Sequence, residues 1–285
     1  MSSSRLKQVT KCAFCPGAPL TGEHIWPDWA KVYFQRTGHD ARIETLQTSP
    51  VKSDLILSLD SQERHGHSVT KRLRVVCRGC NNTWMSELET AAKPLLEAML
   101  LGHRTELTTA DQDAVGRWVA LKMMVTDLSV PSESVFTRAE RESFRANPAV
   151  PNGMKIWLFG YGGINWRSAL RLESYLASTV RGADPLTIAS WADVPREGLH
   201  KNTRGMTLGF GCLLVFAFFT RVADFEEVAP VDFEGSVAHL WPQRHTSIVW
   251  PPGPLINERD ADFVSRRLER AWQSPRSVTI PAALA

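Results

Sequence analysis

Four cysteines stand in two pairs, each with the spacing Cys-x-x-Cys. The first pair is Cys12 and Cys15, and the second is Cys77 and Cys80. Two such pairs supply the four thiolates of a closed tetrahedral zinc site, and in a reducing compartment this spacing favours a metal over disulfides. A zinc ion held by both pairs would clamp together two segments that are far apart in the chain. We therefore predict a structural zinc site on these four thiols.

Polar residues with catalytic potential stand close to both pairs. Glu23 and His24 follow the first pair, and Asn81 follows the second directly. Carboxylate and amide oxygens suit Mg²⁺ or Mn²⁺, and an imidazole can take a proton from water near neutral pH. A divalent ion can also hold a phosphoryl oxygen during hydrolysis. These groups indicate phosphodiester hydrolysis, with Glu23 and Asn81 as ligands of the catalytic ion and His24 as the base.

Each of these residues also has an interpretation without catalysis. Glu23 and His24 can form a polar strand end that only frames the zinc site. Asn81 or Asn82 can simply be the N-cap of the helix that follows. Three tryptophans close to the cysteine pairs have helical spacings typical of core residues, and we expect Glu87 and Glu89 to face solvent. The tryptophans are Trp26, Trp29 and Trp84.

The positive charge of the chain is concentrated near the cysteines. The net charge is +3, and residues 1–107 hold 14 Lys and Arg against 11 Asp and Glu, whereas residues 108–285 hold 19 of each. Four basic residues surround the second cysteine pair, either as phosphate contacts for a nucleic acid or as a solvated strand edge. They are Lys71, Arg72, Arg74 and Arg78.

The distribution of apolar residues predicts neither a secretory signal nor a membrane-spanning segment. The first ten residues have no apolar segment of the kind found in secretory signals, and the longest apolar run, residues 212–219, is too short to span a bilayer. We expect a cytoplasmic protein without membrane contact. The run at 212–219 predicts a buried strand, in which Cys212 is a small core residue.

The remaining pattern predicts an α+β protein with two parts. Pro27 favours a helix over residues 28–35, residues 41–76 are β-rich, and a helix is expected over residues 82–101, kinked or split at Pro94. Capping boxes at Thr109–Gln112 and Thr137–Glu140 predict two further helices. Strands dominate from residue 155, and a last helix is expected over residues 258–272. We place a domain boundary near residue 107, giving domains 1–107 and 108–285.

Over about residues 10–95, the sequence resembles the zinc-stapled HNH (ββα-metal) endonucleases. The pattern that carries the resemblance is "CAFC…LTGEHIWP…VVCRGCNN", followed by an expected helix. The resemblance implies a treble-clef-like ββα-metal unit in the N-terminal domain and a mixed C-terminal domain with an antiparallel sheet and helices. It implies that His24 is the general base, that Glu23 and Asn81 bind the catalytic ion, and that the four cysteines hold structural zinc. The implied product carries a 5′-phosphate.

Two positions depart from the family pattern. The family usually has a middle asparagine before the second cysteine pair, but residues 25–76 contain none. Some members also have a second histidine where this chain has Met85. These departures keep a second hypothesis open, a zinc-stabilised nucleic-acid-binding module that does not cut. A third hypothesis is a zinc staple for a protein-interaction domain.

The expected function is a divalent-metal-dependent DNA endonuclease, with RNA as an open alternative target. With one active site per chain, a monomer would nick one strand and a homodimer would cut both. The C-terminal domain is then expected to select the substrate or a partner protein. Phage defence, restriction, mobile-element transfer and repair all employ this motif, and the sequence does not choose among them.

Overall fold

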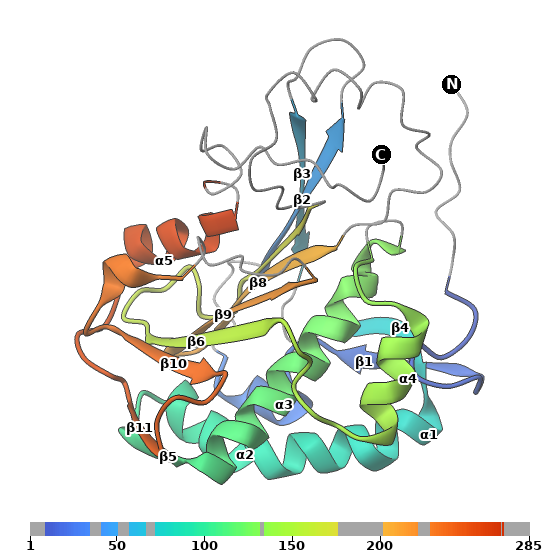
Figure 1. Cartoon of the computed structure of the whole chain (residues 1–285), viewed down its shortest axis with the longest axis horizontal. Coiled ribbons are helices and arrows are strands. Elements are labelled where there is room, and N and C mark those ends of the chain that lie inside the picture. Colours follow the sequence, from blue (N-terminus) through green and yellow to red (C-terminus); the bar gives the residue numbers. More distant parts are fainter. Residues whose placement is uncertain are drawn as a thin grey trace.

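A computed structural model describes most of the chain and shows a mixed α/β protein (Figure 1). The described residues are 9–34, 41–50, 57–66, 72–131, 134–175, 202–221, 229–268 and 270. Within these ranges, no helix combines the length and the apolar character needed to cross a membrane.

Within the described ranges, seven strands form the larger sheet, in the order β10-β6-β9-β8-β7-β2-β3. Neighbouring strands are antiparallel except β2 and β7, which run parallel. The strands are β2 (Ala41–Pro50), β3 (Leu57–Gly66), β6 (Met154–Gly160), β7 (Leu170–Tyr175), β8 (Thr203–Phe210), β9 (Leu213–Thr220) and β10 (Val237–Trp241).

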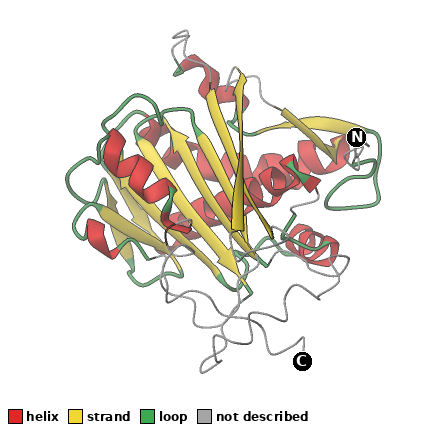
Figure 2. Cartoon of the chain, turned by 90° about the horizontal axis from the view of Figure 1, so that it is seen from above, coloured by secondary structure: helices red, strands yellow, loops and turns green. Residues whose placement is uncertain are grey.

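The two faces of this sheet pack into two hydrophobic cores (Figure 2). Strand β9 is buried along its whole length, and its side chains alternate between the cores, as a strand covered on both faces requires. Val215 and Ala217 belong to the core with the long helices α2 (Ser86–Leu100) and α3 (Thr109–Thr126), whereas Phe216 belongs to the core with α5 (Glu258–Ser265). The predicted buried strand is confirmed, and Cys212 lies half-buried in the turn before it.

A smaller β-unit lies beside α4 (Arg138–Ala146), where the two cysteine pairs meet (Figure 1). Strand β1 (Leu20–His24) pairs antiparallel with β4 (Arg72–Cys77), and the chain then continues into α1 (Arg78–Cys80), a π-helical turn (Asn81–Met85) and α2. The helical segment therefore begins directly where strand β4 ends. Elsewhere β5 (Thr105–Thr108) pairs with β11 (Ser247–Trp250).

The hairpin β2–β3 lies between β1 and β4 in sequence but joins the larger sheet, where β2 pairs with β7. Strand β5 contains residue 107 and pairs with β11, which belongs to the predicted C-terminal domain. The predicted division near residue 107 therefore does not separate two sheets. Both sides of it contribute side chains to the core that contains the four cysteines.

Several predicted helix boundaries differ from those observed. The helix predicted over residues 28–35 is not α-helical in its described part, residues 28–34, where a 3₁₀ turn covers Asp28–Val32. Helix α2 continues through Pro94 without being split. The capping box of α3 begins one residue earlier than predicted, at Thr108, whereas the box of α4 at Thr137 is confirmed. The short 3₁₀ turns elsewhere are Asp127–Ser129 and Val231–Phe233.

Candidate metal centre and adjacent pocket

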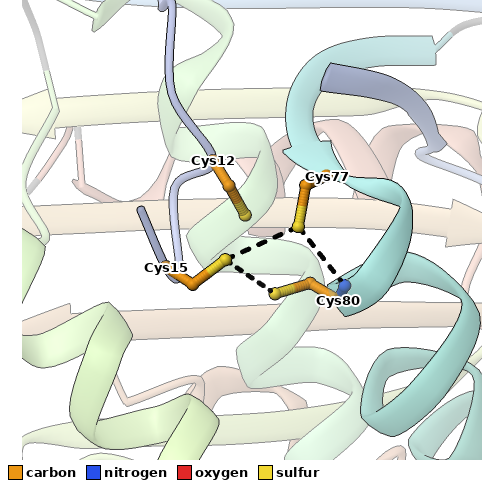
Figure 3. A group of neighbouring side chains, drawn as sticks. All are labelled: Cys12, Cys15, Cys77 and Cys80. Atoms are coloured by element: carbon orange, nitrogen blue, oxygen red, sulfur yellow. Dashed lines mark hydrogen bonds between the residues drawn. The ribbon is translucent and has the colours of Figure 1, made fainter. Parts of the chain in front are cut away.

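The four paired cysteines converge on one another from two segments (Figure 3). Their sulfur atoms all lie within 4.8 Å of one another, and all four residues are buried. The Sγ atom of Cys15 lies 3.5 Å from those of Cys77 and Cys80. With Zn–S bonds of about 2.3 Å, the edge of a zinc tetrahedron is about 3.8 Å long. The cluster therefore has the donor set and the spacing of a closed zinc site.

Local backbone contacts shape both cysteine loops. The Gly17 amide donates to Cys15 Sγ at 3.3 Å, and the Cys80 amide donates to Cys77 Sγ at 3.5 Å. A Cβ atom at Gly17 would lie 3.1 Å from the sulfurs of Cys15 and Cys77, so a side chain there would crowd the cluster. Arg138 on α4 donates to the carbonyl of Cys12 and so ties the first loop to the rest of the molecule.

The environment has unequal effects on the thiols. Burial raises the pKa values of Cys12 and Cys80, because the charged thiolate is poorly solvated there. Burial acts in the same direction on Cys77, but hydrogen bonds from the Cys80 amide and from neighbouring thiols outweigh it and lower the pKa of Cys77 to about 7. A bound cation would stabilise all four thiolates together. The prediction of a four-cysteine cluster that could bind zinc is confirmed.

Helix α1 begins directly at this cluster. Cys77 is its N-cap, and the Cys77 sulfur accepts a hydrogen bond from the Cys80 amide. The prediction that Asn81 or Asn82 caps the helix is therefore wrong. The following turn over Asn81–Met85 is π-helical, and Thr83 leaves helical geometry with φ −114° and ψ −109°. Such turns interrupt a helix locally and are frequent at functional sites.

The strand and the helix start border an open polar pocket of about 410 Å³. The three predicted catalytic residues all line it, Glu23 and His24 from the end of β1 and Asn81 from the π-helical turn. The structure thus brings together side chains from distant parts of the sequence beside the cysteine cluster. The other lining residues are Asp28, Asn82, Met85, Ser86 and Glu89.

Glu23 is engaged by a lysine that the sequence did not point to. The side chain of Lys122 on α3 is 1% exposed, and its Nζ lies 2.7 Å from Glu23 Oε1 and 3.5 Å from Glu89 Oε2. Burial alone would lower the pKa of Lys122, but the carboxylates of Glu23 and Glu89 outweigh burial and raise it. The lysine is therefore a charged ammonium. Glu89 is half-buried, so the expectation that it faces solvent is wrong.

Both predicted ligands of a catalytic divalent ion make other contacts in this arrangement. One oxygen of Glu23 already accepts from the ammonium of Lys122. The amide nitrogen of Asn81 is directed at Thr21, 3.4 Å from its Oγ1. Among the described residues, the four cysteines are the one group of three or more His, Cys, Asp or Glu side chains arranged to hold a metal ion. The catalytic Mg²⁺ or Mn²⁺ stays a prediction.

His24 and Asp28 line the pocket next to each other. Its Nε2 is 3.1 Å from Asp28 Oδ1, close enough for an ionic contact but not aligned as a hydrogen bond. Burial lowers the pKa of His24, and the nearby charge of Arg72 adds to this effect, while Asp28 opposes it. The imidazole is therefore neutral near pH 7 and able to accept a proton. The main-chain carbonyl of His24 accepts from Lys122 Nζ at 2.9 Å.

The described basic residues of the second cysteine segment are exposed, and Arg72 lies next to the pocket residues His24 and Asp28. Arg72 stands opposite His24 in the β1–β4 pair, with its Nη2 4.0 Å from Asp28 Oδ1. Arg74 and Arg78 are exposed, and Arg74 donates to the Leu20 carbonyl at 3.3 Å. Arg72 and Arg74 share one face of β4, because strand residues two apart point the same way. Lys71 lies outside the described residues.

Aromatic residues anchor the pocket segment to the larger sheet. The indole of Trp26 is buried and donates to the Gly209 carbonyl at 2.8 Å, and the ring of Trp29 packs against Phe210. Trp84 packs against Phe14 in the first cysteine loop. The three tryptophans therefore lie in or against the core, as predicted.

Sequence reasoning missed Asp28 and Lys122. Asp28 follows His24 by four positions, where the chain turns back beside the strand end. Lys122 stands in the apolar run "WVALKMMV", and a single lysine on a buried helix needs a carboxylate partner. That signal was available, although it does not say which carboxylate is the partner.

No protein family, curated protein or solved structure matches the chain.

Proposed function

We propose that the chain is an HNH-type phosphodiester hydrolase that acts on DNA, with His24 activating the attacking water. The observation that supports this proposal is the shared pocket: Glu23, His24 and Asn81 line one polar space next to a zinc-type cysteine cluster. Further support comes from the antiparallel pair β1–β4, which leads directly into the helical segment that carries Asn81.

In the proposed reaction, water attacks phosphorus and the neutral imidazole of His24 takes its proton. The bond from phosphorus to the 3′-oxygen breaks, and the leaving oxygen takes a proton from solvent. Asp28 positions His24 and stabilises the imidazolium that forms. The exposed side chains of Arg72, Arg74 and Arg78 contact phosphates of the bound nucleic acid. The zinc cluster takes no part in bond breaking and only holds the strand end against the helix start.

The test is nicking of a supercoiled plasmid by the zinc-loaded chain, with Mg²⁺, with Mn²⁺ and with a chelator too weak to remove thiolate-bound zinc. We expect His24→Ala to lower the nicking rate by about 10²- to 10⁴-fold, the range of a lost general base. His103→Ala is the matched control, because His103 is an exposed histidine in the turn after α2. Equal nicking by wild type and His24→Ala would remove His24 from the reaction. A labelled RNA substrate in parallel distinguishes the two nucleic acids.

A second candidate function is a zinc-stabilised nucleic-acid-binding module that does not cut. The observation that favours it is the ion pair of Glu23 with Lys122, which occupies a group that the cutting hypothesis assigns to a metal. A gel-shift experiment separates the two functions. The binding module predicts that His24→Ala still binds DNA and that changing Arg72, Arg74 and Arg78 to Gln abolishes binding. It also predicts that no variant nicks the plasmid under any metal condition.

A further inference from the structure

The buried ammonium of Lys122 is the one charged group that reaches the pocket carboxylates from the core side of the described structure. It lies on α3, and its Nζ contacts Glu23 Oε1 at 2.7 Å, the His24 carbonyl at 2.9 Å and Glu89 Oε2 at 3.5 Å. The ring of Trp118, one helical turn earlier, lies 5.9 Å from the same nitrogen. Four side-chain or main-chain groups therefore surround one cation position.

Both carboxylates at this position also line the pocket, whereas Lys122 does not. Glu23 and Glu89 therefore lie between the ammonium and the solvent-accessible space. A divalent cation entering the pocket and binding Glu23 would be separated from the ammonium by a single carboxylate group. Like charges that close repel strongly, and burial on the core side leaves little water to screen them.

We propose that Lys122 is the resident cation of this site and takes, at Glu23, the charge-compensating place that the sequence resemblance gives to a divalent ion. Glu23 is then a positioning residue. The ion pair of Glu23 with Lys122 fixes the end of β1. Lys122 also binds the main-chain carbonyl of His24 and so holds the backbone that carries the imidazole. The inference about the ion stands whether or not the chain cuts. Its bearing on hydrolysis rests on the proposed function.

One structural consequence can be measured without any catalytic assay. Removing the ammonium leaves two converging carboxylates without a counter-ion, next to an open pocket and the Asn81 amide. Such a set of oxygen ligands binds hard divalent cations. We expect Lys122→Met to create a Mn²⁺ site that the wild-type chain does not have.

The experiment is a Mn²⁺ titration of the full zinc-loaded chain, followed by electron paramagnetic resonance of free Mn²⁺. Thiolate sites prefer zinc over manganese, so the cysteine cluster does not compete for the probe. Wild type and Glu23→Gln should bind Mn²⁺ alike. Lys122→Met should bind at least about tenfold more tightly than wild type, because it loses a unit charge in contact with the carboxylate. The double variant Lys122→Met/Glu23→Gln should lose this gain.

Two results would overturn the inference. One is a Mn²⁺ site in the wild-type chain that Glu23→Gln weakens about tenfold or more, since Glu23 would then be a metal ligand despite Lys122. The other is a folded Lys122→Met that binds Mn²⁺ no more tightly than wild type. If Lys122→Met does not fold, the comparison of wild type with Glu23→Gln still decides the question. Neither result depends on nicking, so a failure of the proposed hydrolysis is recognised separately in the His24→Ala assay.

Discussion

The cysteine cluster and the Lys122 cluster are neighbouring ion-binding arrangements with opposite designs. In the first, four buried thiols converge and supply only ligands, so the charge that stabilises their thiolates has to come from a bound cation. In the second, two carboxylates converge on an ammonium that belongs to the chain itself. Two adjacent sites of one small unit thus differ in whether their cation would be recruited from solution or is part of the chain.

This difference also decides how each site is linked to the fold. The cysteines join two loops of the same β-unit, and Cys77 at the same time caps α1. Lys122 comes from α3, 99 positions along the chain from Glu23, and joins the β-unit to the helical layer under the larger sheet. One site therefore holds the β-unit together, and the other holds it in place. Changing each site separately tests this distinction.

The largest effect is expected from breaking the cysteine cluster. Cys80→Ser removes one of four ligands inside a core shared with the larger sheet. Structural zinc contributes on the order of 10 kcal/mol in small domains, and whole domains are stable by about 5–15 kcal/mol. We expect Cys80→Ser to lose zinc and to fail to fold at 25 °C, measured by metal analysis and circular dichroism.

Cys212→Ser is the matched control for that variant, because Cys212 is half-buried and lies outside the cluster. It should keep one zinc ion per chain and melt near the wild-type temperature. A wild-type chain that contains no zinc, or a Cys80→Ser chain with unchanged unfolding, would end the interpretation of the cluster as a recruited-cation site.

An intermediate effect is expected at the built-in cation. Lys122→Met leaves Glu23 buried without its partner, and breaking a buried pair from one side costs about 3–5 kcal/mol. Adding Glu23→Gln removes the uncompensated charge and should restore most of that loss. Urea unfolding of the zinc-loaded proteins at pH 7 without added divalent ions gives the required double-mutant cycle.

Lys11→Met serves as the control in the cycle, since Lys11 is an exposed lysine just before the first cysteine. It should change the free energy of unfolding by less than about 0.5 kcal/mol. If the two single changes at Lys122 and Glu23 simply add, the two side chains do not stabilise each other, and the contrast between the sites is lost.

The cysteine cluster was predictable because its information is local. Two Cys-x-x-Cys pairs name their ligand set by spacing alone, and the apolar run that became β9 and the capping box at Thr137 are equally local signals. The pocket was predictable only in part. The cysteine pairs brought Glu23 and Asn81 close, but the position of Asn81 as a helix cap was wrong because Cys77 takes that role.

The partner of Glu23 was not predictable, because it depends on how α3 packs against β1. No spacing rule links position 23 to position 122, and a buried lysine selects its carboxylate only when the tertiary structure forms. The same reason explains why the hairpin β2–β3 was not assigned to the larger sheet. Its pairing with β7 joins residues that are more than 120 positions apart, where no local pattern operates.

The smallest expected effect is on the pH dependence of stability, which has opposite directions for the Lys122 site and the cysteine cluster. The pKa of Lys122 is raised above its usual value of 10.5, chiefly because the carboxylates of Glu23 and Glu89 outweigh the effect of burial. The stability that comes from its charge is therefore fully present below pH 10.5 and is lost as the pH rises through the raised pKa. Zinc behaves in the opposite way, because acid protonates the thiolates and releases the metal.

The wild-type chain should thus lose zinc-dependent stability on the acid side and lysine-dependent stability on the alkaline side. The double variant Lys122→Met/Glu23→Gln should keep the acid loss and show a shallower alkaline loss, because other groups still titrate there. Chemical unfolding across pH, with zinc measured in each sample, checks both directions. An alkaline limb of equal steepness in wild type and double variant would mean that Lys122 carries no linked charge. The site would then lack the built-in cation that sets it apart from its cysteine neighbour.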